Sequence, residues 1–115
     1  MSATRSTAWT ITNATDSDWT LLSSNLNHGV WATNPPQTIK SGATGTFKSE
    51  SNGFATGDEG TVVYSFSAGS VSFYFDNPFI GSDDFSVNTP PGYDQKSNHQ
   101  TGNTQVITSR VFKTA

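Results

Sequence analysis

The side chains best suited to chemistry in this 115-residue chain are carboxylates near its centre, within loops that also carry glycine and aromatic residues. They are Asp58, Glu59, Asp76, Asp83 and Asp84. Two carboxylates facing each other across a groove can hydrolyse a glycosidic bond, one as acid and the other as base or nucleophile. All five are expected where loops join strands, and Asp commonly accepts hydrogen bonds from turn backbone at such places. We therefore favour a structural role for them over catalysis.

Histidine offers no stronger case for catalysis. A serine triad needs a histidine that is supported by a carboxylate and placed beside the nucleophile. The two histidines are His28 and His99, and neither lies beside a nucleophile-elbow pattern. Both are expected to be ordinary surface residues, and we predict no enzymatic activity.

Signals for metals and cofactors are weak. The Asp oxygens and Asn77 could ligate Ca²⁺, which takes about six to eight oxygen ligands, but no EF-hand spacing is present. The chain has no cysteine, so neither a disulfide nor a thiolate metal site is available. We predict no cofactor, and calcium binding stays open.

The charge balance narrows the classes of partner. Six Lys and Arg stand against nine Asp and Glu, which gives a net charge of -3. Binding to nucleic-acid phosphates depends on clustered basic side chains, and so does electrostatic attraction to anionic lipid. The sequence therefore disfavours nucleic acid and gives no support for a basic membrane-binding patch.

Aromatic rings are the other side chains with a recognition chemistry. Those in alternating segments are predicted to form the core: Trp9, Trp19, Phe66, Phe73 and Phe75. Four others lie in turns flanked by Gly, Pro or Asn: Trp31, Phe54, Phe79 and Tyr93. A ring in a loop either folds back beneath the loop or is exposed. Exposed rings contact membrane interfaces or stack on sugars.

The elements that must position these side chains are strands. Period-2 alternation or β-branched and aromatic composition predicts strands at 8–12, 19–26, 28–31, 37–42, 45–51, 61–67, 70–75, 85–87 and 106–113. Ala68-Gly69 reads as a two-residue hairpin connection. Residues 93–104 are polar and contain glycine, so they are predicted to form a mobile loop.

Short strands, frequent turn signals and the lack of a helical stripe predict an all-β fold, a single compact β-sandwich of mostly antiparallel strands. No linker or repeat is visible, so residues 1–115 are expected to be one domain. No segment approaches the about 20 apolar residues of a membrane span, and residues 1–7 lack the apolar stretch of a signal peptide. We expect a soluble protein, cytoplasmic or exported by a non-classical route, that acts at a membrane surface.

Two stretches resemble known families. Residues 56–64, Thr-Gly-Asp-Glu-Gly-Thr-Val-Val-Tyr, and residues 75–79, Phe-Asp-Asn-Pro-Phe, resemble the central part of the actinoporins. Ile11-Thr12-Asn13 and Trp19-Thr20-Leu21 are similar to the first two core strands of the same proteins. Residues 76–87 also resemble the aegerolysins and small bacterial crystal proteins, which carry Asp, Pro, an aromatic residue, Gly-Ser and then Asp-Phe.

The resemblance implies an actinoporin-like β-sandwich that recognises membrane lipids. Pro78 and Phe79 match the Pro-aromatic pair that lines the headgroup pocket of actinoporins, whereas residues 81–83 stand where those proteins have a tyrosine cluster. Only seven residues precede Ala8, and a helix of that length rises about 10 Å against a hydrocarbon core of about 30 Å. Pore formation by an amino-terminal helix is therefore not expected, and the aegerolysin mode fits better.

The predicted function is that of a non-enzymatic membrane-lipid-binding module, a component of a cytolytic system that acts as a homo-oligomer or with a partner protein. The loop rings would insert shallowly and polar side chains would bind the headgroup. The predicted ligand-binding residues are Trp31, Phe54, Asp76, Asn77, Pro78, Phe79, Ser82, Asp83 and Tyr93. A carbohydrate-binding lectin on the same sandwich is the alternative, and a self-assembling structural protein is a third possibility.

Overall fold

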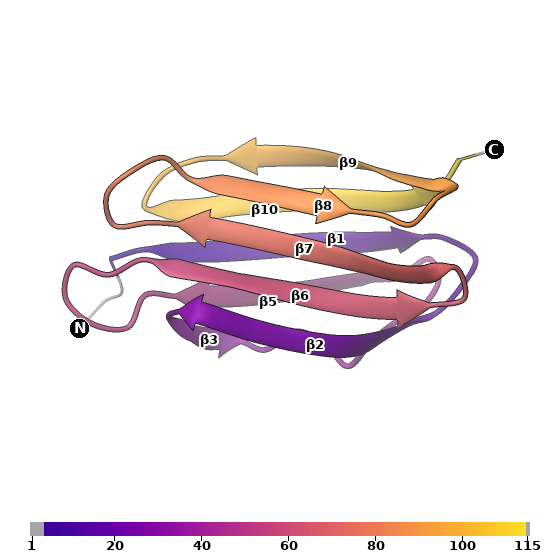
Figure 1. Ribbon diagram of the computed structural model, residues 1–115, viewed down its shortest axis with the longest axis horizontal. Helices are drawn as coiled ribbons and strands as arrows, with labels where there is room; N and C mark the ends of the chain where they lie inside the picture. Colours follow the sequence, from indigo (N-terminus) through magenta and orange to yellow (C-terminus); the bar gives the residue numbers. More distant parts are fainter. Residues whose placement is uncertain (1–3, 115) are drawn as a thin grey trace.

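The computed structural model describes residues 4–114, which form ten strands in two stacked sheets (Figure 1). The first sheet has the order β3 (Val30–Thr33), β5 (Thr44–Glu50), β1 (Ser6–Ala14), β10 (Thr104–Lys113) and β9 (Tyr93–Gln100). The second has the order β4 (Thr38–Ile39), β2 (Trp19–His28), β6 (Asp58–Phe66), β7 (Gly69–Asn77) and β8 (Asp84–Asn88). Residues 1–3 of the segment considered for a signal peptide lie outside the described residues.

The strand pairing confirms the predicted all-β sandwich. Neighbouring strands are antiparallel except for β1 and β10, which run parallel from the pair Ser6–Thr104 to the pair Ala14–Phe112. Burial alternates along β1, β6 and β7, as expected for strands with one face on a core. Within residues 4–114, no helix is long and apolar enough to cross a membrane.

Aromatic rings fill the space between the sheets. Trp9 on β1 is fully buried and meets Phe73 and Phe85 of the second sheet edge-on, at centroid distances of 5.4 and 5.8 Å. Trp19 on β2 packs on Tyr64 at 5.9 Å and on Phe73 at 6.1 Å. The predicted core rings are thus buried, apart from Phe66, which is half-buried against the core. Edge-on packing suits the ring quadrupoles and adds to the apolar area that these rings bury.

The mobile loop predicted for residues 93–104 is wrong. Residues Tyr93–Gln100 form β9, which pairs with β10 along its whole length. The strand was missed because the side chains on its inward face are mostly polar: Ser97 hydrogen-bonds Ser109, and His99 hydrogen-bonds Gln105, each across to β10. Only residues 101–103 remain as a connection.

Smaller differences concern strand ends. The β6–β7 hairpin is confirmed, but Phe66 pairs with Gly69, so the two loop residues are Ser67 and Ala68, one position earlier than expected. The expected strand at 28–31 is shifted, since β2 continues to His28 and β3 begins at Val30. The expected strand at 37–42 shrinks to Thr38–Ile39.

One amide joins the sheets at the end where β6 begins and β7 finishes. The side chain of Asn77 is buried, and its Nδ2 donates to three main-chain carbonyls: Ser6 O at 3.0 Å, Gly102 O at 3.1 Å and Asn103 O at 3.0 Å. These carbonyls belong to β1 and to the β9–β10 connection, in the opposite sheet. Asn77 therefore fixes how the loops at this end sit relative to each other.

Replacing Asn77 with Ala is expected to lower the free energy of unfolding by about 2–3 kcal/mol, because the carbonyls lose their donor where water has little access. Urea unfolding followed by tryptophan fluorescence measures the change. Asn88→Ala is the control, since Asn88 is exposed and its side chain makes no hydrogen bond within residues 4–114. Equal losses in the two variants would contradict this role for Asn77.

Candidate functional site

Three loops meet at the Asn77 end, which we call the loop end: residues 51–57, 78–83 and 101–103. The first two touch at Gly57, where a Cβ would lie 2.5 Å from Asn77 O and 2.8 Å from Pro78 Cα. A side chain at this position would push the loops apart. Ala55, in the same loop, has a φ of 58°, a conformation uncommon for residues with a Cβ. The 51–57 loop is therefore held in a defined shape against the 78–83 loop.

A cavity of about 420 Å³ lies between these two loops and the adjoining strand ends. Its lining combines an apolar wall with acidic and imidazole groups: His28, Ala55, Thr56, Gly57, Asp58, Glu59, Asp76, Pro78, Phe79 and Ile80. The volume falls in the range of small-molecule sites. This cavity is the candidate functional site.

Arg5 holds the 78–83 loop in place. Its Nε donates to Pro78 O at 3.3 Å, and its Nη2 donates to Phe79 O at 2.8 Å. The guanidinium also lies over the Phe79 ring, with Cζ 4.8 Å from the ring centroid. Its Nη1 donates to Thr4 O at 2.8 Å, so each guanidinium nitrogen donates to a main-chain carbonyl. Arg5 thus fixes both the backbone and the ring of this loop.

Large apolar side chains protrude from the loop end. Phe54 is 90% exposed and Ile80 is 85% exposed, on the two loops that flank the cavity. Val30, at the start of β3, is 39% exposed and pairs with Glu50 at the same end. Of the four large apolar residues that are exposed within residues 4–114, only Leu22 lies elsewhere, along β2. Grouping at one end points to a contact surface.

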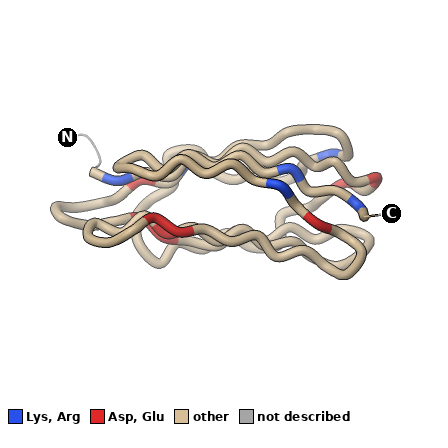
Figure 2. Tube along the Cα trace, turned by 90° about the horizontal axis from the view of Figure 1, so that it is seen from above, with Lys and Arg blue, Asp and Glu red and all other residues tan. Residues whose placement is uncertain are grey.

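Charge is distributed unevenly between the two sheets. Figure 2 shows the largest group of acidic positions on one layer and most of the basic positions on the other. The acidic group consists of Glu59, Asp76 and Asp84, which are cross-strand neighbours at the loop end of the second sheet. The loop-end cavity is therefore flanked by negative charge.

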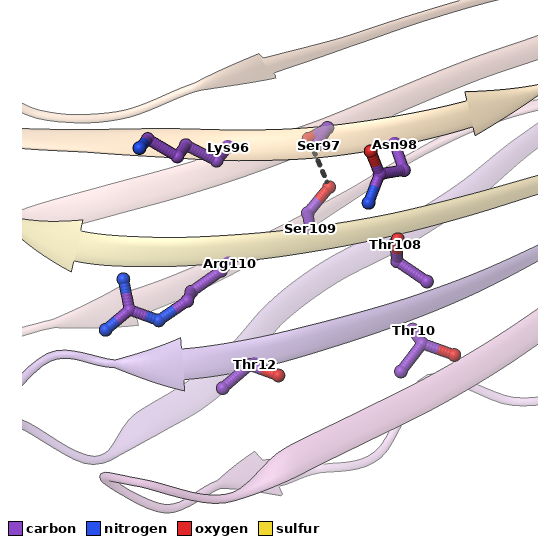
Figure 3. Close-up of a pocket in the computed structure, with 8 residues that line it drawn as sticks. All are labelled: Thr10, Thr12, Lys96, Ser97, Asn98, Thr108, Ser109 and Arg110. Carbon is purple, nitrogen blue, oxygen red and sulfur yellow. Dashed lines mark hydrogen bonds between the residues drawn. The ribbon is translucent and has the colours of Figure 1, made fainter.

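A second hollow, of about 730 Å³, lies on the outer face of the first sheet (Figure 3). Its lining is polar and includes both basic and hydroxyl side chains: Thr10, Thr12, Lys96, Ser97, Asn98, Thr108, Ser109 and Arg110. None of these residues lines the loop-end cavity. The two hollows differ in charge as well as in position.

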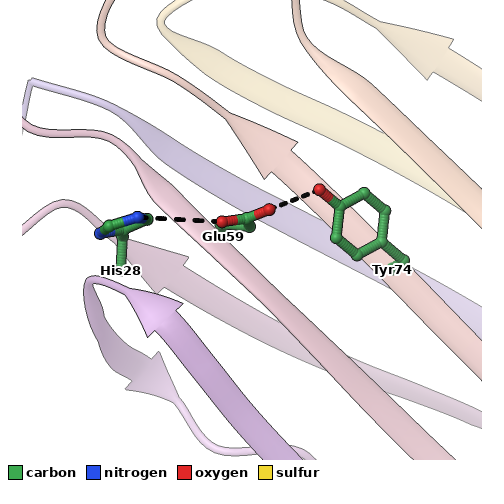
Figure 4. A network of polar contacts seen from close by, with 3 residues as sticks. All are labelled: His28, Glu59 and Tyr74. Atoms are coloured by element: carbon green, nitrogen blue, oxygen red, sulfur yellow. Dashed lines mark hydrogen bonds and ion pairs between the residues drawn. The ribbon is translucent and has the colours of Figure 1, made fainter.

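Glu59 is the centre of a polar chain on the second sheet (Figure 4). Tyr74 donates its hydroxyl to Glu59 Oε2 at 2.5 Å, and His28 Nε2 lies 3.9 Å from Glu59 Oε1. The hydrogen bond to Glu59 raises the pKa of Tyr74, so this hydroxyl keeps its proton. Partial burial, followed by the charges of Glu59 and Asp84, raises the pKa of Asp76 above the ordinary 3.8. The carboxylates at this rim therefore repel one another.

Asp58 is the buried carboxyl of the site. It accepts a hydrogen bond from Ser49, yet burial outweighs that bond and raises its pKa above 3.8. Its cross-strand neighbour is Asn77. Oδ1 of Asp58 and Oδ1 of Asn77 are both buried and have no donor within residues 4–114. The buried side chains of Asp58 and Asn77 therefore offer more hydrogen-bond acceptors than their neighbours supply donors.

The structure brings part of the predicted site together. Asp76, Pro78 and Phe79 line the loop-end cavity, and Phe54 lies beside it on the 51–57 loop. Ser82 and Asp83 line a neighbouring hollow of about 300 Å³, which Arg5 also lines. The carboxylate of Asp83 accepts from Gly102 N at 2.8 Å and so ties the 78–83 loop to the 101–103 connection. Asn77, being buried, supports the site from beneath.

Two predicted site rings do not line the cavity. Trp31 belongs to β3, half-buried, and packs edge-on against Phe47 at 5.6 Å and Phe75 at 6.1 Å. Tyr93 begins β9 at the far end of the sandwich, where its ring meets Phe66 edge-on at 5.1 Å.

Sequence reasoning missed Arg5, Ile80 and the position of His28. Arg5 is remote in sequence from the 78–83 loop that it holds, so no local sequence pattern indicates this contact. Ile80 follows directly after the Pro78-Phe79 pair, and an apolar residue beside a glycine in a loop was a usable signal. Within residues 4–114, no group of three or more His, Asp or Glu side chains is arranged to hold a metal ion.

No family model matches this sequence. An uncharacterized protein of Dictyostelium discoideum is 35% identical over 89 residues, which amount to 75% of this chain but 8% of that protein. The chain therefore spans a small part of the relative that it matches. Among solved structures, the crystal structure of the lipid-binding protein Nakanori matches 96% of this chain and 72% of its own, with a TM-score of 0.82 and 14% identity. The chain shares the fold of Nakanori.

The raised pKa of Asp58 has a consequence for stability. Between pH 3.8, where the unfolded carboxyl titrates, and the higher pKa of the folded state, the folded protein binds more protons than the unfolded chain. This group therefore makes stability fall as pH rises through that window. Asp58→Asn carries no charge and supplies N–H donors, so it is expected to be more stable than the wild type at pH 7.

Urea unfolding at a series of pH values from 4 to 7 tests this expectation. The advantage of Asp58→Asn should grow as pH rises and then level off. Asp16→Asn is the control, because Asp16 is exposed in a turn and should give no such gain. If Asp58→Asn is less stable than the wild type at pH 7, the ionised Asp58 carboxyl does not destabilise the fold and this expectation is wrong.

Proposed function

We propose that this protein binds membrane lipid through its loop end and carries out no enzymatic reaction. The observation that carries the proposal is the exposure of Phe54 and Ile80 on the two loops that flank the cavity. Apolar side chains of this size gain about 1.5–3 kcal/mol each when they leave water. Their backbones are already ordered, which lowers the entropy cost of insertion.

The fold supports the same role. Nakanori, which shares this sandwich at a TM-score of 0.82, is a lipid-binding protein. The resemblance of residues 76–87 to the aegerolysins covers the β7–β8 connection, which carries Pro78, Phe79 and Ile80 at the rim of the cavity. These two observations concern different levels: the first concerns the whole fold, and the second concerns one loop at the loop end.

The charges of the cavity favour a headgroup that carries a positive nitrogen. Glu59 and Asp76 line the cavity together with the Phe79 ring, and carboxylates and aromatic faces both attract ammonium groups. Arg5, whose guanidinium lies over the Phe79 ring, already donates to Thr4, Pro78 and Phe79 carbonyls, so it offers little to a phosphate. The acidic rim would repel vesicles rich in anionic lipid. We therefore propose zwitterionic lipids as the ligand class.

Binding of this kind is shallow. Two or three side chains at loop tips would reach the interface, and no helix within residues 4–114 is long and apolar enough to cross a membrane. A lytic role, if the protein belongs to a cytolytic system, would therefore require a homo-oligomer or a partner protein. The alternative of a lectin uses the same cavity, with the Phe79 ring beneath a sugar and Asp76 bonding its hydroxyls.

Replacing Ile80 or Phe54 with Asp is expected to weaken binding to phosphatidylcholine–sterol vesicles by about tenfold or more, because each variant loses one inserted side chain and adds a charge. Vesicle sedimentation measures the bound fraction. Leu22→Asp is the matched control, since Leu22 is 65% exposed but lies away from the loop end. Its binding should equal that of the wild type.

The same experiment separates the alternatives. Wild-type protein that fails to sediment with any zwitterionic or sterol-containing vesicle contradicts the lipid proposal. A glycan array with a clear signal that is lost in Phe79→Ala would favour the lectin instead.

Vesicle binding should also depend on pH through Asp76. Its carboxylate faces Glu59, Asp84, Asp83 and His28, and its raised pKa means that it gains a proton at a higher pH than an ordinary Asp. Lowering the pH from 7 to 4 is therefore expected to weaken binding to phosphatidylcholine, because a growing share of Asp76 loses its charge. Asp76→Asn should bind weakly at both pH values, whereas Asp94→Asn, at the far end, should behave as the wild type. A pH profile for Asp76→Asn that matches the wild type would contradict this role.

A further inference from the structure

We propose that the hollow on the outer face of the first sheet is a second binding site, for a sugar that carries a sulfate or phosphate group. This site is separate from the loop-end cavity and does not depend on it. Its chemistry follows from the side chains of three neighbouring strands, β1, β10 and β9.

Two cations stand side by side in this hollow. Arg110 on β10 is the direct cross-strand partner of Lys96 on β9, and both side chains are exposed. Figure 3 shows them extending in the same direction along the two strands. The guanidinium of Arg110 lies over the Phe112 ring, with Cζ 5.4 Å from its centroid, which limits where it can point. Two positive groups held this way present a fork of N–H donors.

Neither cation has an acidic partner in the described part of the chain. Within residues 4–114, no carboxylate oxygen lies within 4.0 Å of Lys96 Nζ or of the Arg110 guanidinium. Asp94 is two residues along β9 from Lys96, and its Oδ1 accepts from Gln95 N. Like charges directly opposite each other on antiparallel strands destabilise a sheet. The contact with Phe112 stabilises Arg110, but no acidic side chain among residues 4–114 offsets the repulsion between the two cations, and a local cost of this kind is typical of a functional site.

Hydroxyl and amide groups continue the polar surface beyond the two cations. Thr12 and Thr10 on β1 lie beside Arg110 and Thr108 on β10, and Asn98 on β9 lies beside Thr108. Thr12 is bonded to Thr44 at 3.1 Å, whereas the side chains of Thr10, Thr108 and Asn98 make no hydrogen bond within residues 4–114. A ligand that fits this surface needs an oxyanion at one end and hydroxyl groups along its length.

A sugar that carries a sulfate or phosphate ester has this arrangement. We assign the ester to a saccharide and not to the headgroup of a membrane lipid. No exposed large apolar side chain lines the hollow, so the surface has nothing to insert into a bilayer. Lys96, Arg110 and Thr12 lie toward the end opposite the loop end, since Arg110 is three residues from the last residue of β10, Lys113. The site therefore faces the solvent when the loop end faces a membrane.

Calorimetric titration at low ionic strength tests the proposal, with galactose 6-sulfate and glucose 6-phosphate as probes. Saturable binding is expected for at least one of them, and the double variant Lys96→Gln/Arg110→Gln should bind at least about tenfold more weakly, because both charged donors are lost. Lys113→Gln removes one positive charge from the same strand outside the hollow and should bind within about twofold of the wild type. If Lys113→Gln weakens binding as much as the double variant does, the effect is one of net charge, and the proposed site is wrong.

Further measurements distinguish a sugar ester from a simple anion and from a lipid headgroup. Inorganic sulfate that binds as tightly as galactose 6-sulfate would overturn the role of the hydroxyl groups, and so would unchanged sugar-ester binding in Thr10→Val/Thr108→Val. Binding of phosphatidylinositol 4-phosphate vesicles that is lost in the double variant, without binding of either free ester, would assign the site to a lipid and overturn the saccharide. The double variant should melt at or above the wild-type temperature, because a cross-strand repulsion is relieved.

Discussion

The packing of Trp9 between the two sheets is the contact on which the rest of the structure depends. Its ring meets Phe73 and Phe85 of the second sheet edge-on, and its indole N–H donates to Ser109 Oγ at 2.9 Å, so that no polar atom of the ring is left unpaired. The separation of the sheets is thereby fixed in the middle of the sandwich. Because β7 carries Phe73 and ends at Asn77, the same packing sets where the loop end begins.

The loop end combines a rigid base with exposed tips. Asn77 joins β7 to the opposite sheet, Asp83 joins the 78–83 loop to the 101–103 connection, and Arg5 holds two carbonyls of that loop. Every one of these bonds uses main-chain carbonyls or amides and leaves the apolar side chain of Ile80 free. A surface of this kind can contact a lipid surface without rearranging, because the loops are already ordered in the free protein.

The sequence was sufficient for the fold because β1, β6 and β7 alternate, and the rings Trp9, Phe73 and Phe75 fall on their inward faces. It was insufficient for β9, whose inward face is polar and is recognisable only once β10 is paired with it. For the site, the Pro78-Phe79 loop was a local signal. No local signal indicated which aromatic rings lie at which end of the sandwich, because strand direction and pairing decide the end that each turn occupies.

The parallel pairing of β1 with β10 also bears on how the protein is made. Residues that are neighbours in this ladder, such as Ser6 and Thr104, are 98 positions apart in sequence. The second sheet is built from hairpins and strands closer in sequence, whereas the first lacks the strand between β1 and β9 until β10 has been synthesised. Contacts of such long range slow folding and leave strand edges open in the meantime. On the ribosome, β1 can pair early with β5, but its other neighbour, β10, begins 98 positions after Ser6 and is made much later.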